Sequence, residues 1–331
     1  MTVLVIDVAA EHSGALTILN QFISEFEHDE NNNYYIALST LDYEDTKNIT
    51  FLQFPWVKKT HLHRLVFDKF YVPKLVERYH PDVLLSLQNN AFPVNDLKQE
   101  VYFHNALPIA EKRFAFTESK NLWIYQNIIG TIVRHSLKYA DSIIVQANWI
   151  KKTLETKWGI NNSKIIVKKP TVVYPEVIRS YHPVALFYPA NGSIYKNHIT
   201  LIKALIPIWE QFGAPELRLT GAQEELPEEC QNLLKKNEYP ITFLGRLTND
   251  EMIEQYLSTL LVFPSYIETV GLPLIEAKAL GCKIIVSDCD YAHEALENYN
   301  DVIFFPCFNI DSLRSAIVSS CRAVEIIKQE R

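Results

Sequence analysis

The sequence of 331 residues lacks any apolar run approaching the roughly 20 residues that a membrane-spanning helix requires. Its start, MTVLVIDVAAEHSG, is a short apolar stretch broken by Asp7, without the basic residues and cleavage site of a signal peptide. Cysteines are also few: there are five, all in the second half, and none forms a CxxC pair. Such scattered cysteines fit buried thiols in a reducing compartment better than disulfides or a zinc site. We therefore expect a cytoplasmic protein.

Several catalytic motifs are missing as well. No GxGxxG or P-loop pattern occurs, which argues against a nicotinamide enzyme or an ATPase, and no serine elbow suggests a hydrolase. The triplet Asp288-Cys289-Asp290 follows a predicted strand and is interpreted as a loop, while His61 and His63 have no third ligand at useful spacing. We expect no metal and no bound cofactor.

Positive charge is scarce overall but concentrated in one region. The net charge is −7 and the pI is about 5.8, which disfavours a nucleic-acid partner. Residues 98–170, however, carry 12 Lys or Arg against 5 Asp or Glu. This region fits an anionic partner such as a membrane surface, or it is a set of solvated helix faces that happen to be basic.

The length suits two domains of roughly 150 residues each. Short apolar runs alternate with helical patterns, which predicts parallel sheets covered by helices. Expected strands in the first half are 2–7, 34–39, 82–87, 100–105, 141–147 and 164–169. Those in the second half are 184–190, 216–221, 241–245, 259–265, 282–288 and 301–306.

The stretch 171–183 has turn residues and no clear period, so it is the predicted linker. The expected domains are then 1–170 and 184–331, with a last helix, 311–331, that packs back toward the first domain. In folds of this kind, ligands collect at the carboxyl ends of the strands. Helices are expected after Ser13, at 121–138, behind a Thr248–Glu251 capping box, and after Asn197 as an N-cap.

Two glutamates eight positions apart, Glu268 and Glu276, lie in FPSYIETVGLPLIEAKALGC, residues 263–282. A buried strand precedes Glu268, and Pro273 and Gly281 are typical of a helix start and end. Glu268 is therefore expected in a strand-to-helix loop at the carboxyl edge of the sheet. Ionised carboxylates accept hydrogen bonds from vicinal hydroxyls, and free N–H groups at a helix start stabilise an anion.

The segment SYIETVGLPLIEAKALGCK, residues 265–283, resembles the E-x7-E region of retaining GT-B glycosyltransferases, especially family 4. It departs from that pattern at Thr269, Val270 and Lys283, where the family has Gly, Phe and Pro. The resemblance implies two facing Rossmann-like domains with a cleft between them. It also implies that Glu276 holds the ribose of a nucleotide sugar and Glu268 lies at the donor sugar. The loop amides would meet sugar and diphosphate; these are Val270, Gly271 and Leu272.

The stretch FYPANGSIYKNHITLIKAL, residues 187–205, resembles the first strand and helix of the family's second domain. By this resemblance Lys196 binds the donor diphosphate, and a lysine beside a positive helix end is unfavourable unless an anion is bound. Asn191 stands where the family usually has an arginine. Arg246 is the candidate replacement for that arginine.

The first domain resembles the family less closely. SLKYADSIIVQANWIKKTL, residues 136–154, is similar to the passage that closes the family's N-terminal sheet. His104, in VYFHNALP, stands where relatives carry a histidine near donor sugar and acceptor. The loop after the first strand resembles the glycine-containing loop near the reaction centre, which makes His12, Ser13 and Gly14 acceptor-side candidates.

The resemblance thus implies retaining transfer of a sugar from a UDP, GDP or dTDP sugar to a hydroxyl acceptor. Together with the basic region 98–170, it favours a lipid-linked acceptor at the inner face of the membrane during assembly of a bacterial surface glycan. Three alternatives stay open: a GT-B sugar-nucleotide epimerase, a soluble sucrose- or trehalose-type transferase, and a non-catalytic GT-B partner subunit.

Overall fold

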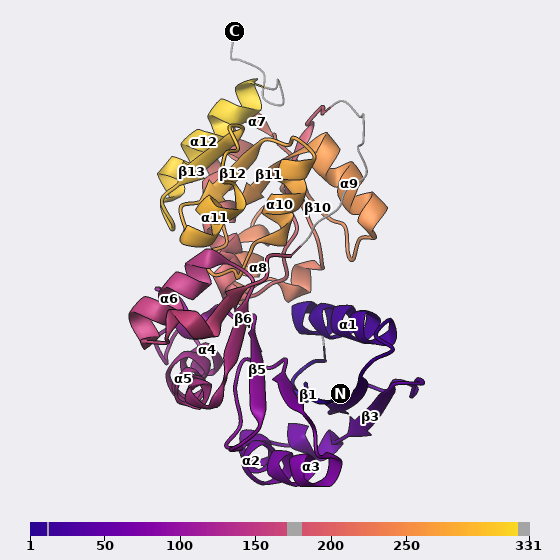
Figure 1. Cartoon of the computed structure of the whole chain (residues 1–331). Coiled ribbons are helices and arrows are strands. Elements are labelled where there is room, and N and C mark those ends of the chain that lie inside the picture. The colour runs from indigo at the N-terminus through magenta and orange to yellow at the C-terminus, as the bar shows by residue number, and fades with distance from the viewer. Residues whose placement is uncertain (12, 171–180, 324–331) are drawn as a thin grey trace. The chain divides into compact units, whose positions relative to one another are not determined.

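The computed structural model describes residues 1–11, 13–170 and 181–323, and the chain forms two compact units, Met1–Lys169 and Pro170–Arg331 (Figure 1). Each unit is an α/β domain built on one parallel sheet, so the predicted fold class of two Rossmann-like domains is confirmed. Of the predicted linker, residues 171–180 lie outside the described part of the chain.

The first sheet has seven parallel strands in the order β3-β2-β1-β4-β5-β6-β7. They are β1 (Thr2–Ile6), β2 (Asn33–Leu38), β3 (Ile49–Gln53), β4 (Val83–Ser86), β5 (Lys98–Phe103), β6 (Ser142–Val145) and β7 (Ile165–Val167). All but β3 were expected. This edge strand is only half-buried, so its sequence ITFLQ carries a weak pattern.

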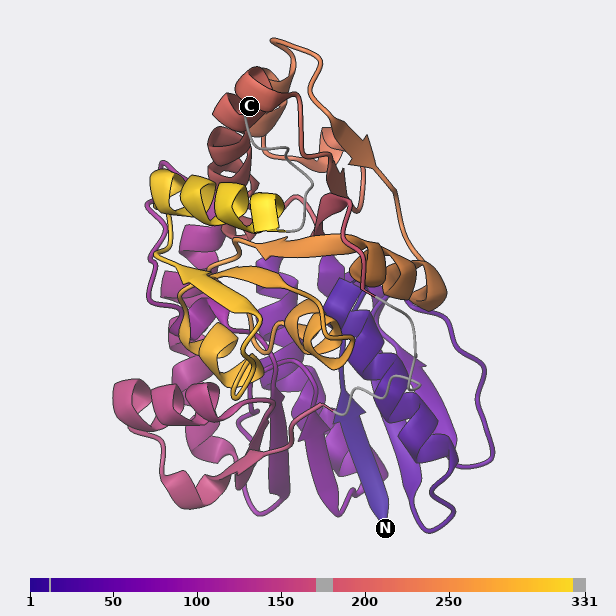
Figure 2. The same ribbon diagram turned by 90° about the horizontal axis from the view of Figure 1, so that it is seen from above.

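Helices cover both faces of this sheet, because alternate strand residues point to opposite sides. On one face α1 (Ser13–Glu27) packs against Val3 and Val5, while on the other Leu4 and Ile6 meet a continuous helical segment (Figures 1 and 2). That segment comprises α2 (His61–Val66), the π-helical turn η2 (Phe67–Tyr71) and α3 (Val72–Tyr79). The remaining helices of the domain are α4 (Lys120–Ile124), α5 (Gly130–Ser136) and α6 (Asn148–Trp158), with a π-helical turn η4 (Tyr125–Ile129) inside the predicted helix 121–138.

The second sheet has six parallel strands in the order β10-β9-β8-β11-β12-β13. They are β8 (Ala185–Tyr188), β9 (Leu217–Leu219), β10 (Ile241–Phe243), β11 (Thr259–Phe263), β12 (Ile284–Ser287) and β13 (Val302–Phe305), and all six were expected. Its helices are α7 (His198–Phe212), α8 (Glu228–Leu234), α9 (Asn249–Ser258), α10 (Leu272–Ala279), α11 (Asp290–Ala295) and α12 (Ile310–Ala323). Helix α12 packs against α7 within its own domain, and the end of the predicted last helix, 324–331, lies outside the described residues.

Short 3-10 turns complete the connections. They are η1 (Pro55–Lys58), η3 (Leu107–Ile109), η5 (Leu137–Tyr139), η6 (Asn162–Lys164), η7 (Ile194–Lys196) and η8 (Gln223–Glu225).

Strand order places a topological switch point in the second sheet between β8 and β11. The chain leaves β8 toward β9 on one side, whereas β11 starts the run toward β12 and β13 on the other. Loops that follow strands at such a point diverge, and ligands bind in the crevice that they leave at the carboxyl edge. The loops after β8 and β11 are those that carry Lys196 and Glu268.

Helix starts bear out one predicted cap and correct another. Thr248 and Glu251 form the expected capping box at α9, with the Thr248 N–H donating to Glu251 Oε2 at 2.7 Å. Asn197 precedes α7 but its side chain does not cap the helix backbone, so that prediction was wrong. A left-handed backbone (φ 61°) turns the Asn197 amide toward the Pro264 carbonyl, and its oxygen accepts from the Thr200 hydroxyl at 2.7 Å.

Candidate functional site

An ion pair joins the two loops at the switch point. Lys196, at the end of η7, places its Nζ 2.5 Å from Oε1 of Glu268, which follows β11. The side chains are 15% and 14% exposed, so solvent can still reach both. The structure therefore brings together two residues that were predicted separately.

Backbone and tyrosine hydrogen bonds hold these loops in register. The Tyr266 N–H donates to the Tyr195 carbonyl at 3.1 Å, and the Tyr188 hydroxyl donates to the Lys196 carbonyl at 2.6 Å. The Tyr291 hydroxyl donates to the Ser265 carbonyl at 2.6 Å. Tyr195, Ser265 and Tyr266 are close neighbours of Lys196 and Glu268 in the sequence. Their hydrogen bonds therefore hold the backbone on both sides of the ion pair in place.

The two tyrosines also respond to the charge of Glu268. Burial raises the pKa of Tyr188 and of Tyr291 well above the usual range, and the nearby Glu268 carboxylate raises it further. Both phenols therefore stay protonated and keep donating to the loop carbonyls at any physiological pH.

Glu276 lies on α10 and is oriented by a residue that sequence reasoning missed. The Tyr256 hydroxyl, on α9, donates to Glu276 Oε2 at 2.6 Å. Tyr256 is fully buried and packs edge-on against the Phe187 ring, whereas Glu276 is half-buried. One carboxylate oxygen is thus anchored, and no local pattern in the sequence links the two residues.

The loop amides lie at the start of α10 as expected. Val270 and Gly271 offer backbone N–H groups that have no acceptor among the described residues, and Leu272 is the exposed first residue of the helix. Gly271 has φ 71°, and a Cβ there would lie 3.2 Å from the Tyr291 ring. The geometry can receive an anion or a hydroxyl oxygen.

Within the described part of the chain, the other two predicted donor residues make no hydrogen bond or ion pair with Lys196 or Glu268. Asn191 is exposed, and its Oδ1 accepts from the Ser193 N–H at 3.1 Å, which shapes the turn after β8. Arg246 is exposed beyond β10, an edge strand that β9 separates from β8.

Next to Lys196, the sequence reasoning also passed over His198. This residue is 1% exposed, and neither ring nitrogen has a partner among the described residues. Burial, reinforced by the Lys196 charge, lowers its pKa to about 4. A neutral imidazole therefore packs against the Tyr188 ring, 4.9 Å between centroids, under the loop.

In the first domain, His104 follows β5 and is held from two sides. Its backbone N–H donates to Asn89 Oδ1 at 2.7 Å, and its Nε2 lies 2.8 Å from the Leu87 carbonyl. Burial lowers the pKa of His104, so the ring is neutral, with Nε2–H donating and Nδ1 left as an acceptor.

The loop after β1 is described in part. His12 lies outside the described residues, Ser13 begins α1, and Gly14 is exposed in its first turn. Burial raises the pKa of Asp7, at the carboxyl end of β1, to about 7. Glu11 Oε2 pairs with Lys58 Nζ at 2.9 Å, which ties this loop to the one after β3.

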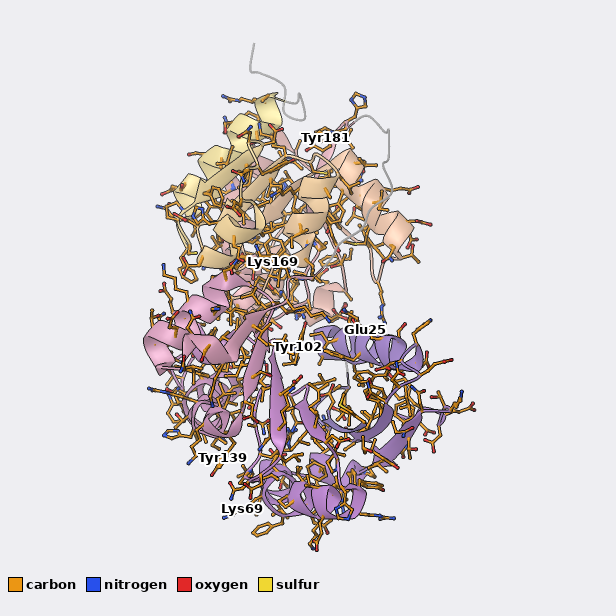
Figure 3. All side chains as sticks on the ribbon, in the orientation of Figure 1. Glu25, Lys69, Tyr102, Tyr139, Lys169 and Tyr181 are labelled. Carbon is orange, nitrogen blue, oxygen red and sulfur yellow. The ribbon has the colours of Figure 1, made fainter. Side chains whose placement is uncertain are left out.

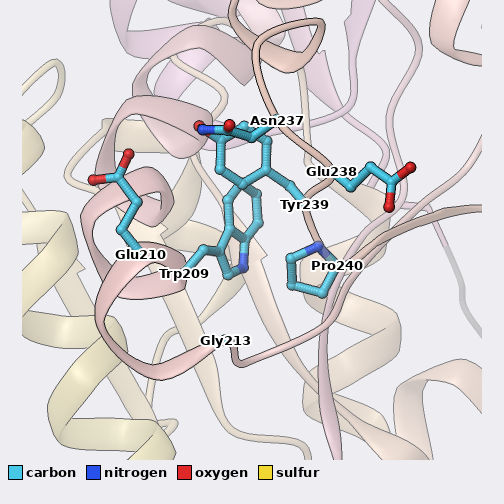
Figure 4. A pocket seen from close by; sticks show the side chains of 7 residues that line it. All are labelled: Trp209, Glu210, Gly213, Asn237, Glu238, Tyr239 and Pro240. Atoms are coloured by element: carbon cyan, nitrogen blue, oxygen red, sulfur yellow. The ribbon is translucent and has the colours of Figure 1, made fainter.

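No group of three or more His, Cys, Asp or Glu side chains that could hold a metal gathers within residues 1–11, 13–170 and 181–323. A pocket of about 630 Å³ opens at the amino edge of the second sheet, beside the Trp209 indole and the Tyr239 ring (Figure 4). Its charged lining is Glu210 and Glu238, and none of the predicted site residues lines it.

Residues 178–320 match the family described as Glycosyl transferases group 1. The chain is 24% identical over 271 residues to a protein of Campylobacter jejuni subsp. jejuni serotype O:2 named N,N'-diacetylbacillosaminyl-diphospho-undecaprenol alpha-1,3-N-acetylgalactosaminyltransferase. That match covers 75% of this chain and 70% of the relative.

Solved structures share the fold across nearly the whole chain. Sucrose-phosphate synthase from Thermosynechococcus elongatus aligns with a TM-score of 0.71 at 16% identity, covering 98% of this chain and 91% of that one. Anabaena HepE in complex with UDP-glucose aligns with a TM-score of 0.65 at 14% identity, covering 99% and 91%. The chain therefore has the GT-B fold. None of its described helices has the length and apolar character needed to cross a bilayer.

Proposed function

We propose that this chain is a glycosyltransferase that transfers a sugar from a nucleotide-diphosphate sugar to a hydroxyl acceptor with retention of configuration. The premise is that the chain has the GT-B fold and matches the glycosyl transferases group 1 family over residues 178–320. One observation carries the proposal. At the switch point of the second sheet, Lys196 and Glu268 meet, and α10, which starts four residues beyond Glu268, carries the anchored Glu276.

The chemistry follows from what the reaction must stabilise. The leaving diphosphate gains negative charge, and Lys196 with the N–H groups of Val270 and Gly271 would offset it by preorganised electrostatics. Glu276 would bind the ribose hydroxyls, and Glu268 would bind the donor sugar. In the first domain, the neutral His104 would orient the sugar. In this mechanism the donor phosphate itself accepts the proton of the acceptor, so no protein base is assigned, and no metal is required.

A lipid-linked acceptor is the substrate class that we favour. The Campylobacter relative is named for a diphospho-undecaprenol acceptor, and that name, together with positive charge on the first domain, supports the choice. The protein would then work in the cytoplasm, peripherally at the inner face of the membrane, on a bacterial surface glycan.

The test is a thermal-shift panel of UDP, GDP, dTDP, ADP and CDP on the wild type, Lys196→Ala and Glu276→Ala. A nucleotide at 100 times its Kd adds about 2.7 kcal/mol of stability, which is several degrees in Tm for a domain of this size. We expect one base to give the shift and both variants to lose it.

Lys203→Ala is the matched control, because Lys203 also forms an ion pair, with Glu229 at 2.6 Å, but lies on the exposed side of α7. This control should keep the shift. If no nucleotide stabilises the wild type at millimolar concentration, the donor site is refuted and the partner-subunit alternative takes its place.

A further inference from the structure

The helical segment 61–79 of the first domain carries several large apolar side chains that are exposed to solvent. On its inner side Phe67, Val72 and Leu75 are buried against the sheet. On its outer side Leu62 is 68% exposed and Phe70 is 54% exposed. Leu65 is also exposed, and Tyr71 is partly exposed, with one side of its ring packed against Trp56 at 4.8 Å between centroids. We call these four side chains, Leu62, Leu65, Phe70 and Tyr71, the outer apolar face.

This clustering is local rather than general. Thirteen large hydrophobic side chains are exposed in the described chain, and four of them fall within residues 62–71. Scattered exposed apolar side chains need no explanation, whereas a cluster on one helical segment indicates a contact surface.

Positive charge surrounds the outer apolar face. Residues 58–78 hold six Lys or Arg and two Asp or Glu, although the first 97 residues as a whole are acidic. Lys69 Nζ lies 5.5 Å from the Phe70 ring and Lys74 Nζ lies 5.2 Å from the Tyr71 ring, so cations border the apolar side chains directly. Figure 3 labels Lys69 on this segment.

The basic region 98–170, which the sequence favoured for membrane contact, uses part of its charge internally. Four of its lysines pair with carboxylates at 2.6–3.4 Å; they are Lys98, Lys112, Lys157 and Lys168. In the segment 58–78, Lys58 and Arg64 have such partners among the described residues, and Lys59, Lys69, Lys74 and Arg78 remain available to an outside anion.

We propose that the outer apolar face and its flanking lysines dock on an anionic lipid surface. Apolar side chains bordered by lysines on one face of a helix are the arrangement that lies in a membrane interface, where apolar groups enter the acyl boundary and cations meet lipid phosphates. A second protein copy is the poorer fit, because four unpaired cations would face four others across a symmetric contact.

The position of this face suits the acceptor side of the proposed function, on which this step rests. The inner side of the same segment is tied to the loop after β4: Arg64 Nε contacts Asp68 Oδ1 at 2.9 Å, and Gln88 Nε2 lies 3.5 Å from that oxygen. The next residue, Asn89, holds the backbone of His104. A lipid surface at the outer apolar face would therefore be two contacts away from the acceptor-side histidine.

The experiment is co-flotation of the full chain with vesicles of phosphatidylcholine containing phosphatidylglycerol, compared with phosphatidylcholine alone. Lys69→Gln with Lys74→Gln should weaken the association constant about 25-fold, on the order of fivefold for each charge. Leu62→Ser with Phe70→Ser should weaken it by about tenfold or more. The matched control is Arg113→Gln with Lys120→Gln, two exposed cations of region 98–170, which should stay within about twofold of wild type.

Each outcome decides the proposal. If the control variant loses vesicle binding and the segment variants keep it, the lipid-binding surface lies in region 98–170 and the proposal is refuted. Failure of the wild type to float with anionic vesicles would refute lipid docking. A light-scattering mass of two chains that Leu62→Ser with Phe70→Ser returns to one would assign the face to a second copy instead.

Nucleotide thermal shifts, measured on the same variants, should match wild type. If the segment variants lose flotation and keep their nucleotide shifts, both proposals are supported. If flotation depends on the segment but no nucleotide stabilises the wild type, the proposed glycosyltransferase activity is refuted and the lipid-docking surface is retained.

Discussion

Replacement of Tyr256 by Phe tests whether Glu276 holds a ribose. The change removes one hydroxyl and keeps the ring that packs against Phe187, so it opens no cavity. A hydrogen bond to a charged group contributes about 1.5–3 kcal/mol. Because Glu276 is half-buried, water can replace the lost donor, and most of the effect should appear in ligand binding rather than in stability. We expect about tenfold weaker binding of the nucleotide diphosphate, or about 1.4 kcal/mol.

The assay is calorimetric titration of wild type and Tyr256→Phe with the ribonucleotide and with its 2′,3′-dideoxy counterpart. If Tyr256 acts by orienting Glu276 toward the ribose, the dideoxy nucleotide should bind weakly to the wild type and no more weakly to Tyr256→Phe. The matched control is Tyr239→Phe, which removes a hydroxyl bonded to Asn237 beside the distant pocket and should change neither titration.

Equal losses for both nucleotides in Tyr256→Phe would refute the reasoning, because a hydroxyl that serves the ribose contact cannot matter once the ribose hydroxyls are gone.

Three further outcomes are expected. The pKa of His198 is lowered to about 4 from 6.5, so the free energy of unfolding should fall by about 3 kcal/mol as pH falls from 6.5 to 4. In urea unfolding, His198→Gln should show a smaller fall over this pH range. The same fall in wild type and variant would contradict the prediction. A hydrogen bond from Cys289, 3.2 Å away, lowers the pKa of Cys307 to about 7. The rate of alkylation of Cys307, followed by peptide mapping, should therefore rise with pH with a midpoint near pH 7. Cys289→Ala should move this midpoint to higher pH. Gly271→Ala should cost about 1–2 kcal/mol of stability, because φ is 71° and Tyr291 crowds the new methyl, and it should weaken the nucleotide shift; an unchanged melting temperature would exclude that strain.

The strands were predictable from the sequence because most are buried in parallel sheets and appear as continuous apolar runs. Where burial is one-sided, as in the edge strand β3, the pattern fades and the prediction missed it. The π-helical turns at 67–71 and 125–129 left no signal either, since the helical periodicity continues through them.

The site was predictable residue by residue but not contact by contact. Glu268 and Lys196 were each found through local motifs, yet they are 72 residues apart and meet only because β8 and β11 are neighbours in the sheet. Tyr256 was missed for the same reason: its partner Glu276 lies across β11, on another helix. Asn197 shows the opposite limit, because a left-handed backbone angle turned a sequence-typical cap toward Pro264.

The charge balance of the site points to one more consequence of the proposed function. Lys196 is paired with Glu268 in the free protein, so a diphosphate can pair closely with Lys196 only when Lys196 exchanges its carboxylate partner for phosphate. That exchange would free Glu268, which is only 14% exposed and cannot be fully rehydrated, so it needs hydroxyl donors at once. The sugar of a nucleotide sugar supplies them, while a bare nucleotide diphosphate does not. We therefore expect the intact donor to bind more tightly than its diphosphate, by calorimetric titration, and Glu268→Gln to reduce the difference because an amide pairs less strongly with both Lys196 and hydroxyls. A diphosphate that binds as tightly as its sugar conjugate would show that Glu268 stays with Lys196 throughout.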